Sequence, residues 1–296
     1  MDSRLAAELI DAQFPALRPA RAGFLGEGCD NRAFVVNGAW VFRFPKRPDV
    51  ERQLAIEARL LAALDQSAAL PLSVPRVSFH GRPSAAYPLR FGGYRLLPGV
   101  TANLADPDEL PLPRLAPVLG RFLSVLHAFP VDEAARCGVP EAPMEGFVGE
   151  VGEEALENFG LVAELAPEAA DRWRAFLTAG PAGVPAGRRV LVHNDLAAEH
   201  VLYDAAAETL SGVIDWADAA IGDPSADLSG VLHWGGMPLL ERVLQSYGGP
   251  VDEDTISCGR YLAACRGAGD VAFGVERGRG EYVAAGLRAL RLCIDG

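Results

Sequence analysis

Two aspartates that follow short apolar segments could together carry out phosphoryl transfer. Residues 190–192 are apolar and lead into Asp195, and residues 212–214 lead in the same way into Asp215. A strand–turn–strand over residues 200–215 would bring both carboxylates into one cleft. One carboxylate could then orient a substrate hydroxyl and accept its proton, while the other holds Mg²⁺ on nucleotide phosphates. The alternative interpretation is a purely structural charge network.

The residues around the first aspartate follow a known order. Protein kinases carry His-Arg-Asp-Leu-x-x-x-Asn, followed by Asp-Phe-Gly. Here residues 193–200 are His-Asn-Asp-Leu-Ala-Ala-Glu-His, and residues 215–217 are Asp-Trp-Ala. His, Asp and Leu fall in register, and His200 replaces the metal-binding Asn. Only a short segment separates Asp215 from Asp227 and no Ala-Pro-Glu motif follows, so a platform for peptide substrates is not expected.

Residues 193–204 and 212–227 resemble the aminoglycoside and macrolide phosphotransferases, which share the protein-kinase-like fold. The likeness is greatest to the 2''-aminoglycoside and macrolide branches, which also carry His at the Asn position, and it extends over almost the whole chain. It implies an α+β fold with a small N-terminal antiparallel sheet lobe, one main helix on it, and a larger, mostly helical C-terminal lobe. It also implies a small-molecule O-phosphotransferase that moves the γ-phosphate of ATP or GTP, with Mg²⁺, to a hydroxyl of an aminoglycoside-type or macrolide-type antibiotic.

The resemblance assigns roles to individual residues of the two motifs. It implies that Asp195 is the catalytic base, that Asp215 ligates Mg²⁺ and that His200 takes the second metal-side position. Asp227 would tie down the catalytic loop, and His193 would be a buried scaffold residue. Because Mg²⁺ prefers oxygen ligands, a purely structural role is the alternative for His200.

At the nucleotide end, the resemblance implies a basic residue on a strand, paired with a glutamate of the following helix. Arg43 takes this position on the predicted strand 40–44, and Glu57 of the predicted helix 49–64 is its partner. Arginine supplies the charge of the usual lysine with a planar fork and a different reach. Lys46, the only lysine of the chain, is the alternative contact to the phosphates, and an ordinary ion pair is the alternative for Arg43 and Glu57.

The remaining nucleotide contacts are predicted from the glycine turn and the hinge. Gly26 and Gly28 would form a shortened glycine loop over the phosphates, although Gly-x-Gly is common in turns. Leu96 and Leu97 would offer backbone groups to the base from the hinge between the lobes. Backbone groups do not distinguish adenine from guanine, so either nucleotide is expected as the donor.

A polycationic acceptor requires a site lined with carboxylates, and the net charge of −12 suits such a ligand. Glu199 and Asp218 are candidate acceptor-binding residues, together with His233 and Trp234, which could instead pack between helices. Residues 228–236 are apolar and aromatic where aminoglycoside enzymes of this branch are acidic, which leaves room for a macrolide or another alcohol. Further candidate carboxylates are Asp252, Glu253, Asp254, Asp270, Glu276 and Glu281.

The elements that must position these residues change character at residues 97–100, where Pro98 and Gly99 interrupt the chain. We therefore predict a nucleotide-binding lobe at residues 1–97 and a catalytic and acceptor-binding lobe at residues 98–296. Asn37 and Gly38 predict a tight hairpin turn in the first lobe. Helices are predicted at residues 3–17, 49–64, 115–129, 150–179 and over most of 228–294, and strands at 33–36, 40–44, 74–79, 93–97 and 190–192.

The amino-acid composition indicates a globular protein and argues against several other classes. Half of the residues (50%) are apolar and 22% are charged, which is typical of a globular protein, and an acidic chain without a basic face is not expected to bind nucleic acid. Five cysteines without a Cys-x-x-Cys pair favour neither disulfides nor structural zinc. Without an apolar run of about 20 residues or a signal-like start, we expect a cytoplasmic monomer with no membrane partner.

Two other functions stay open on the sequence. One is a metabolic kinase of the same fold that acts on an amino alcohol or a sugar derivative. The other is a catalytically weak, nucleotide-binding protein of kinase-like fold. The presence of both Asp195 and Asp215 argues against the second, because a protein without catalysis has little need of both carboxylates.

Overall fold

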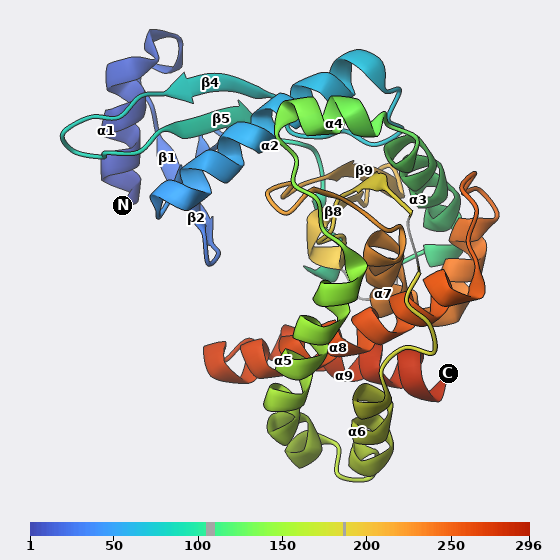
Figure 1. The fold of residues 1–296 in the computed structure, drawn as a ribbon. Helices are drawn as coiled ribbons and strands as arrows, with labels where there is room; N and C mark the ends of the chain where they lie inside the picture. Colours follow the sequence, from blue (N-terminus) through green and yellow to red (C-terminus); the bar gives the residue numbers. More distant parts are fainter. Residues whose placement is uncertain (105–109, 186–187) are drawn as a thin grey trace.

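The structure is a computed structural model that describes residues 1–104, 110–185 and 188–296. An antiparallel sheet near the N-terminus lies on one side of the molecule, and a group of long helices lies on the other (Figure 1). This mixed arrangement confirms the predicted α+β, kinase-like fold. The N-terminal sheet and the helices meet around two small sheets, whose strands β7 and β9 precede Asp195 and Asp215.

The N-terminal sheet has five strands in the order β1-β2-β3-β5-β4, with every neighbouring pair antiparallel. Asn37 and Gly38 have φ of 53° and 67°, so the predicted turn between the second and third strands has the positive backbone angles of type I′. The strands are β1 (Ala22–Glu27), β2 (Asn31–Val36), β3 (Trp40–Pro45), β4 (Val77–Gly81) and β5 (Phe91–Arg95).

One face of this sheet is covered by α1 (Ser3–Gln13), and an aromatic cluster lies between them. Phe42 and Phe44 of β3 belong to the cluster, and the rings of Phe44 and Phe91 stack at 4.5 Å. Because successive side chains of a strand alternate between its faces, Arg43 lies on the opposite face. The alternation therefore directs the predicted phosphate-contacting arginine away from the aromatic core.

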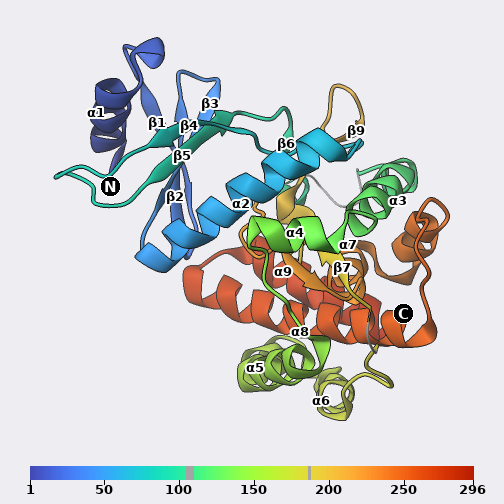
Figure 2. The ribbon, with the colours of Figure 1, turned by 45° about the horizontal axis from the view of Figure 1, so that its top comes forward.

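The opposite face of the sheet is crossed by α2 (Pro48–Ser67), which runs between the sheet and the helical part (Figure 2). Pro48 starts the helix at its first turn, where a missing N–H costs nothing. Leu60, Leu61 and Leu64 pack into the larger core of the molecule, not into the aromatic cluster. This helix therefore joins the sheet to the rest of the fold, and it carries Glu57 beneath Arg43.

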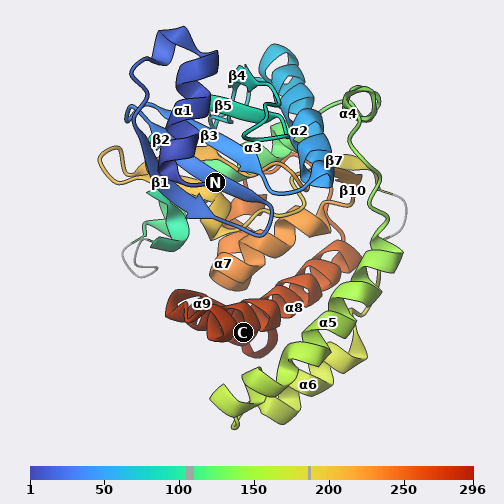
Figure 3. The same cartoon turned by 90° about the vertical axis from the view of Figure 1, so that its left-hand side faces the viewer.

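The larger part contains two small antiparallel sheets, β10-β7 and β6-β8-β9, and helices packed below them (Figure 3). Its strands are β6 (Val100–Thr101), β7 (Val190–Val192), β8 (Val201–Asp204), β9 (Thr209–Val213) and β10 (Ala220–Gly222). Its longer helices are α3 (Leu112–His127), α4 (Val131–Cys137), α5 (Met144–Leu165), α6 (Ala170–Ala179), α7 (Ser225–Leu244), α8 (Glu253–Arg277) and α9 (Gly280–Leu290). The short helical segments of the larger part are η2 (Ala102–Leu104), η3 (Ala198–His200) and η4 (Arg291–Asp295). A further one, η1 (Pro15–Leu17), follows α1 in the N-terminal part.

The structure differs from the sequence prediction mainly at the ends of elements. The first helix ends at Gln13, and Pro15 begins a separate short turn, because proline cannot continue the helical hydrogen bonds. The strand predicted over 74–79 starts only at Val77. All five cysteines are free thiols. Among the helices of the described residues, none combines the length and the apolar character needed to cross a bilayer.

Gly230 allows α7 to pack directly against the catalytic loop. A Cβ atom at this position would lie 1.5 Å from the carbonyl oxygen of Leu196. We expect Gly230→Ala to lower the free energy of unfolding by about 3 kcal/mol, because the backbone must move to accept the methyl group. Chemical denaturation measures this change.

The matched control for this prediction is Gly160→Ala on α5, where an added Cβ meets nothing within 4 Å. Alanine favours the helix over glycine by about 1 kcal/mol, so this variant should be as stable as the parent or more stable. Equal stability of the Gly230→Ala and Gly160→Ala variants would show that the close approach of α7 to the loop is not needed.

Candidate active site

The loop that follows β7 is held from below by Asp227, in the first turn of α7. Its carboxylate accepts the backbone N–H groups of His193 at 3.0 Å and Asn194 at 2.8 Å. The Nε2 atom of His127 lies 3.0 Å from the same carboxylate, and its Nδ1 atom contacts the hydroxyl of Tyr247 at 2.7 Å. Burial acts to raise the pKa of Asp227, but these hydrogen bonds and the His127 ring hold it below its usual range. The anionic carboxylate therefore fixes the backbone of the loop.

His193 links the two predicted motifs to each other. Its Nε2 atom donates to the carbonyl of Ile214 at 3.0 Å, because a carbonyl oxygen can only accept. Its Nδ1 atom is then free to accept the N–H of Asp195 at 3.3 Å. Burial lowers the pKa of His193, so the ring stays neutral and keeps this tautomer. The ring also packs on Trp216, with centroids 4.7 Å apart.

Asp195 and Asp215 lie on either side of His200. The Nδ1 atom of His200 is 2.7 Å from the backbone carbonyl of Asp195, and its Nε2 atom is 3.9 Å from Oδ2 of Asp215. Because the carbonyl can only accept, Nδ1 carries the proton and the lone pair of the neutral ring is on Nε2. Asp215 has φ of 63°, an uncommon angle for a residue with a side chain. The structure thus brings the two predicted carboxylates into one site.

Arg43 connects this site to the N-terminal sheet. Its Nη1 atom donates to both carboxylate oxygens of Glu57, at 2.6 and 2.9 Å, and its Nη2 atom donates to Oδ1 of Asp215 at 3.0 Å. Burial opposes the charge of Arg43, but the two carboxylates outweigh it and raise the pKa of the guanidinium. Burial acts to raise the pKa of Asp215, but the positive charge of Arg43 holds it below its usual range.

Lys46 lies on the glycine turn and not beside the aspartates. Its Nζ atom is 2.6 Å from Oε1 of Glu27 and 2.7 Å from the carbonyl of Gly28. Gly26 sits at an irregularity in the pairing of β1 with β2, and Gly28 follows β1. A Cβ atom on either glycine would meet nothing within 4 Å. The fold itself therefore does not require glycine at these two positions.

The two hinge leucines follow β5, which ends at Arg95, whereas the strand predicted over 93–97 includes both. The N–H of Leu96 donates to the carbonyl of Ala39 at 2.9 Å, so the sheet already uses that donor. Leu97 is half-buried and packs beside Gly212 of β9. Both leucines line a groove with the C-terminal end of α2.

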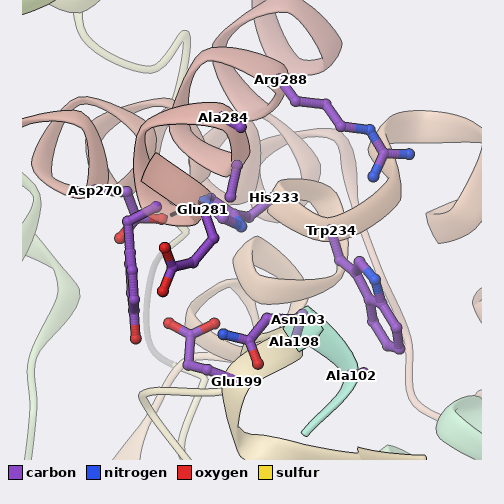
Figure 4. A pocket seen from close by; sticks show the side chains of 12 residues that line it. Ala102, Asn103, Ala198, Glu199, His233, Trp234, Asp270, Glu281, Ala284 and Arg288 are labelled. Carbon is purple, nitrogen blue, oxygen red and sulfur yellow. Dashed lines mark ion pairs between the residues drawn. The ribbon is translucent and has the colours of Figure 1, made fainter. Parts of the chain in front are cut away.

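A pocket beside the catalytic loop gathers several of the predicted acceptor-binding residues (Figure 4). The side chains of Glu199, Asp270 and Glu281 bring three carboxylates to one side of the pocket, from the loop, α8 and α9. His233 lies 2.8 Å from Asp270, and Trp234 lies on the other side of the pocket. The pocket therefore combines negative charge with one large aromatic ring.

Asp195 itself lines an adjoining cavity between α5 and α8. Glu154 and Asn158 of α5 face it, together with Arg266 and Asp270 of α8. Asp270 lines both cavities, so the two hollows adjoin at this residue. An acceptor that spans them would place polar groups near the carboxylates and a hydroxyl near Asp195.

Asp218 is not brought to these cavities. It lies with Glu57 and Asn194 along a separate cavity next to α2. Partial loss of solvent raises its pKa to about 6, and the negative charges of Asp195 and Asp215 contribute to the shift. In this structure, Asp218 is therefore a neighbour of Asp195 and Asp215 and not of Glu199.

Matches to known proteins cover most of the chain. Residues 22–258 match APH, the phosphotransferase enzyme family. The chain belongs to this family. The phosphotransferase is 31% identical over 258 residues to viomycin phosphotransferase of Streptomyces vinaceus, a match that covers 84% of the chain and 82% of the relative. The predicted family and the assignment as a phosphotransferase with a hydroxyl acceptor are thereby confirmed.

Solved structures support the same assignment. The phosphotransferase is similar to APH(2'')-IIIa in complex with GDP and kanamycin, with a TM-score of 0.75, 28% identity and 97% of each chain covered. It is also similar to the macrolide 2'-phosphotransferase MphH of Brachybacterium faecium, with a TM-score of 0.62 and 26% identity over 98% of this chain and 97% of that one. The first neighbour is a 2''-aminoglycoside phosphotransferase and the second a macrolide phosphotransferase, and these are the two branches that the sequence motif resembles.

The structure of this phosphotransferase adds a residue that the motifs did not predict. Arg266 of α8 donates to Asp195 at 2.6 Å and to Glu199 at 2.8 Å. Its neighbours in the sequence, residues 263–267, are otherwise small: Ala, Ala, Cys and Gly. An arginine among small, buried helix residues was a usable signal, because a charge in such a place needs a partner.

The apolar segment 228–236 has a packing explanation in this phosphotransferase. Leu228, Val231 and Leu232 of α7 are buried in the large core, and only His233 and Trp234 reach the pocket. The carboxylates that line the pocket come instead from η3, α8 and α9. The apolar character of this segment therefore does not argue for an apolar acceptor.

Proposed function

We propose that this phosphotransferase moves the γ-phosphoryl group of ATP or GTP to a hydroxyl of an amine-bearing antibiotic. The observation that carries the proposal is the meeting of Asp195 and Asp215 across His200. Arg43 adjoins this meeting point from the sheet, and the pocket with Glu199 adjoins it from the helices. A positive charge that could contact phosphates thus lies on one side of Asp195, and negative charges that could bind a cationic acceptor lie on the other. The two parts, residues 1–97 and 98–296, are proposed to bind nucleotide and acceptor respectively.

In the proposed reaction, Asp195 orients the acceptor hydroxyl and takes its proton. The hydroxyl oxygen forms a bond to the γ-phosphorus, and the bond from that phosphorus to the β–γ bridging oxygen breaks. The nucleoside diphosphate leaves with the electron pair of that bond, and the proton resides on the carboxylate of Asp195. Arg43 is proposed to contact the phosphates on the donor side, while Glu57 holds its guanidinium in place.

The donor set fits a magnesium ion bound together with a nucleotide. Oδ1 of Asp215 accepts a hydrogen bond from Arg43. The other oxygen, Oδ2, is the one that lies near the Nε2 lone pair of His200. Among the described residues, no group of three or more His, Cys, Asp or Glu side chains could hold a metal ion alone. Mg²⁺ commonly takes one or two protein carboxylates and completes its shell with phosphates and water. Asp215 and His200 are therefore the proposed protein ligands, and Mg²⁺ would offset the charge of the phosphates.

The metal-side role of His200 predicts a change in the Mg²⁺ requirement. In His200→Ala no ligand atom takes the place of Nε2 beside Asp215, so the Mg²⁺ concentration needed for half-maximal activity should rise. His200→Asn should rise less, because its amide oxygen is the type of ligand that Mg²⁺ prefers. Mg²⁺ titrations of the parent and of both variants measure this effect. The same requirement in all three proteins would assign His200 to a structural role.

The glycine turn and the carboxylates support the choice of donor and acceptor. The open space beside Gly26 and Gly28 allows phosphates to approach the backbone closely. Three carboxylates around one pocket favour an acceptor with amino groups over a macrolide, whose site would be more apolar. The named relatives point the same way: one phosphorylates viomycin, and another is known in complex with kanamycin and GDP.

The test is the transfer of a labelled γ-phosphate from ATP or GTP, with Mg²⁺, to viomycin, kanamycin, a macrolide and a set of amino alcohols. Label on viomycin or kanamycin would support the proposal and would identify the donor. Label on the macrolide alone would contradict the assignment of a cationic acceptor. Label only on an amino alcohol would favour a metabolic kinase, and nucleotide binding without any transfer would favour a non-catalytic role.

A further inference from the structure

Arg266 donates to two carboxylates of the site at the same time. Its Nη1 atom lies 2.6 Å from Oδ1 of Asp195, and its Nη2 atom lies 2.8 Å from Oε1 of Glu199. The side chain of Arg266 is 25% exposed and that of Glu199 is 17% exposed, so both charges are largely out of water. Charge-assisted hydrogen bonds in such surroundings are short and costly to break. The planar guanidinium can reach both acceptors, whereas a lysine ammonium has no such fork.

This contact leaves one oxygen of the proposed base available. Oδ1 of Asp195 is engaged by Arg266, while Oδ2 is 3.4 Å from Nδ1 of His200. The proton on that Nδ1 is already donated to the backbone carbonyl of Asp195 at 2.7 Å. Within the described part of the chain, Oδ2 has no short hydrogen bond of its own. A hydroxyl that approaches Asp195 would therefore meet Oδ2.

The charges around the pocket explain why the base needs this partner. The amino groups of a cationic acceptor are attracted to Glu199 and Asp270, but also to the anionic Asp195. An ammonium bound to Asp195 would occupy the base and leave the reacting hydroxyl elsewhere. The guanidinium of Arg266 offsets that charge from within the protein.

We propose that Arg266 is a positioning residue of the transfer reaction. It holds Asp195 by Oδ1, directs Oδ2 to the acceptor hydroxyl, and keeps the ammonium groups of the acceptor off the base. Glu199 then anchors Arg266 in addition to lining the acceptor pocket (Figure 4). This inference rests on the proposed role of Asp195 as the base for a cationic acceptor.

The test compares the parent with Arg266→Ala, using viomycin and kanamycin as acceptors. We expect kcat to fall by about 10²-fold, because the base loses its orientation. The KM for the acceptor should fall or stay the same, because an ammonium can now bind to Asp195 in an unproductive mode. The KM for the nucleotide should not change. Added guanidinium ion should restore part of the lost kcat, since it can fill the place of the missing side chain.

The matched control is Arg260→Ala on the same helix. Arg260 donates to the backbone carbonyl of Cys293, at 3.2 Å from Nε and 2.7 Å from Nη2, and it contacts neither carboxylate of the site. Its loss should lower stability without a response of kcat to guanidinium. Arg266→Lys serves if the alanine variant does not fold, because one ammonium cannot serve both carboxylates in the same geometry. It should show the same loss of kcat with no rise of KM.

Two kinetic results would overturn the inference. One is a kcat of the Arg266 variants within about threefold of the parent. The other is a loss that raises the acceptor KM, tracks stability as in Arg260→Ala, and does not respond to guanidinium. Crystal structures of the parent and of the Arg266 variant give a readout that needs no acceptor. A changed orientation of the Asp195 carboxylate would support positioning, and an unchanged one would refute it, even if the parent phosphorylates none of the acceptors.

Discussion

Replacing Asp195 by asparagine is expected to lower the rate of phosphate transfer by about 10²–10⁴-fold. The amide has the shape of the carboxylate, but it cannot take up the proton of the acceptor hydroxyl. Its carbonyl oxygen can still accept from Arg266, which in the parent lies 2.6 Å from Oδ1. Because Arg43, Asp215 and the glycine turn are untouched, the affinity for nucleotide should change little. Transfer kinetics with the accepted antibiotic, and calorimetry with the nucleotide, measure the two effects separately.

The matched control for this variant is Asp204→Asn. Asp204 is a turn residue of the β8–β9 hairpin, and its carboxylate accepts the N–H groups of Ala206 at 2.9 Å and Ala207 at 3.2 Å. An amide oxygen can accept the same bonds, so transfer should stay close to that of the parent. If Asp195→Asn retained a rate within about tenfold of the parent, Asp195 would not be the base.

Much of the catalytic part could be predicted because its residues lie close together in the sequence. The order of residues 193–200, followed by Asp215, predicted a hairpin with a carboxylate on either side, and the structure has β8 and β9 there. Local hydrogen bonds enforce this arrangement: His193 bonds to Ile214, and His200 bonds to the carbonyl of Asp195. Because these hydrogen bonds join residues that are close in the sequence, the spacing of the motif residues was enough to predict how they are arranged.

The acceptor side was harder to predict because tertiary packing assembles it. Arg266 and Asp195 are 71 residues apart, and the residues of α8 around Arg266 match no motif. The boundaries of α8 decide which of its side chains face the catalytic loop, and periodicity in a helix rich in alanine and glycine does not define one face. Asp218 illustrates the opposite difficulty, since it is close to Asp215 in sequence but lines a different cavity from Glu199.

The net charge of the chain does not locate an acceptor site. The chain carries −12, yet only a few of its carboxylates line the cavities beside Asp195. Asp252, which was among the candidate acceptor residues, instead caps α8 by accepting the N–H of Thr255 at 2.8 Å. Acidic residues are common at the first turn of a helix, because their side chains accept hydrogen bonds from the free backbone N–H groups there. A count of carboxylates therefore cannot separate capping residues from binding residues.

Replacing Arg43 by methionine is expected to cost both stability and nucleotide affinity. The change leaves the buried carboxylate of Glu57, 4% exposed, without the guanidinium that lies 2.6 Å away. Removing one partner of a buried ion pair typically costs about 3–5 kcal/mol, because the other charge stays in low dielectric. Asp215 loses its contact at 3.0 Å as well, so the link between the sheet and Asp215 is broken. Chemical denaturation and nucleotide titration measure the two losses.

A second variant separates the two effects of Arg43. In Arg43→Met combined with Glu57→Gln, the buried charge is removed with its partner, so most of the stability should return. The affinity for Mg²⁺–nucleotide should stay low, because the guanidinium proposed to contact the phosphates is absent. Lys46→Met is the matched control, since Lys46 pairs with Glu27 at 2.6 Å on the glycine turn. Its loss should weaken nucleotide binding less than the loss of Arg43 does, because Lys46 does not contact Asp215. A larger loss of affinity in Lys46→Met than in the double variant would transfer the phosphate contact from Arg43 to Lys46.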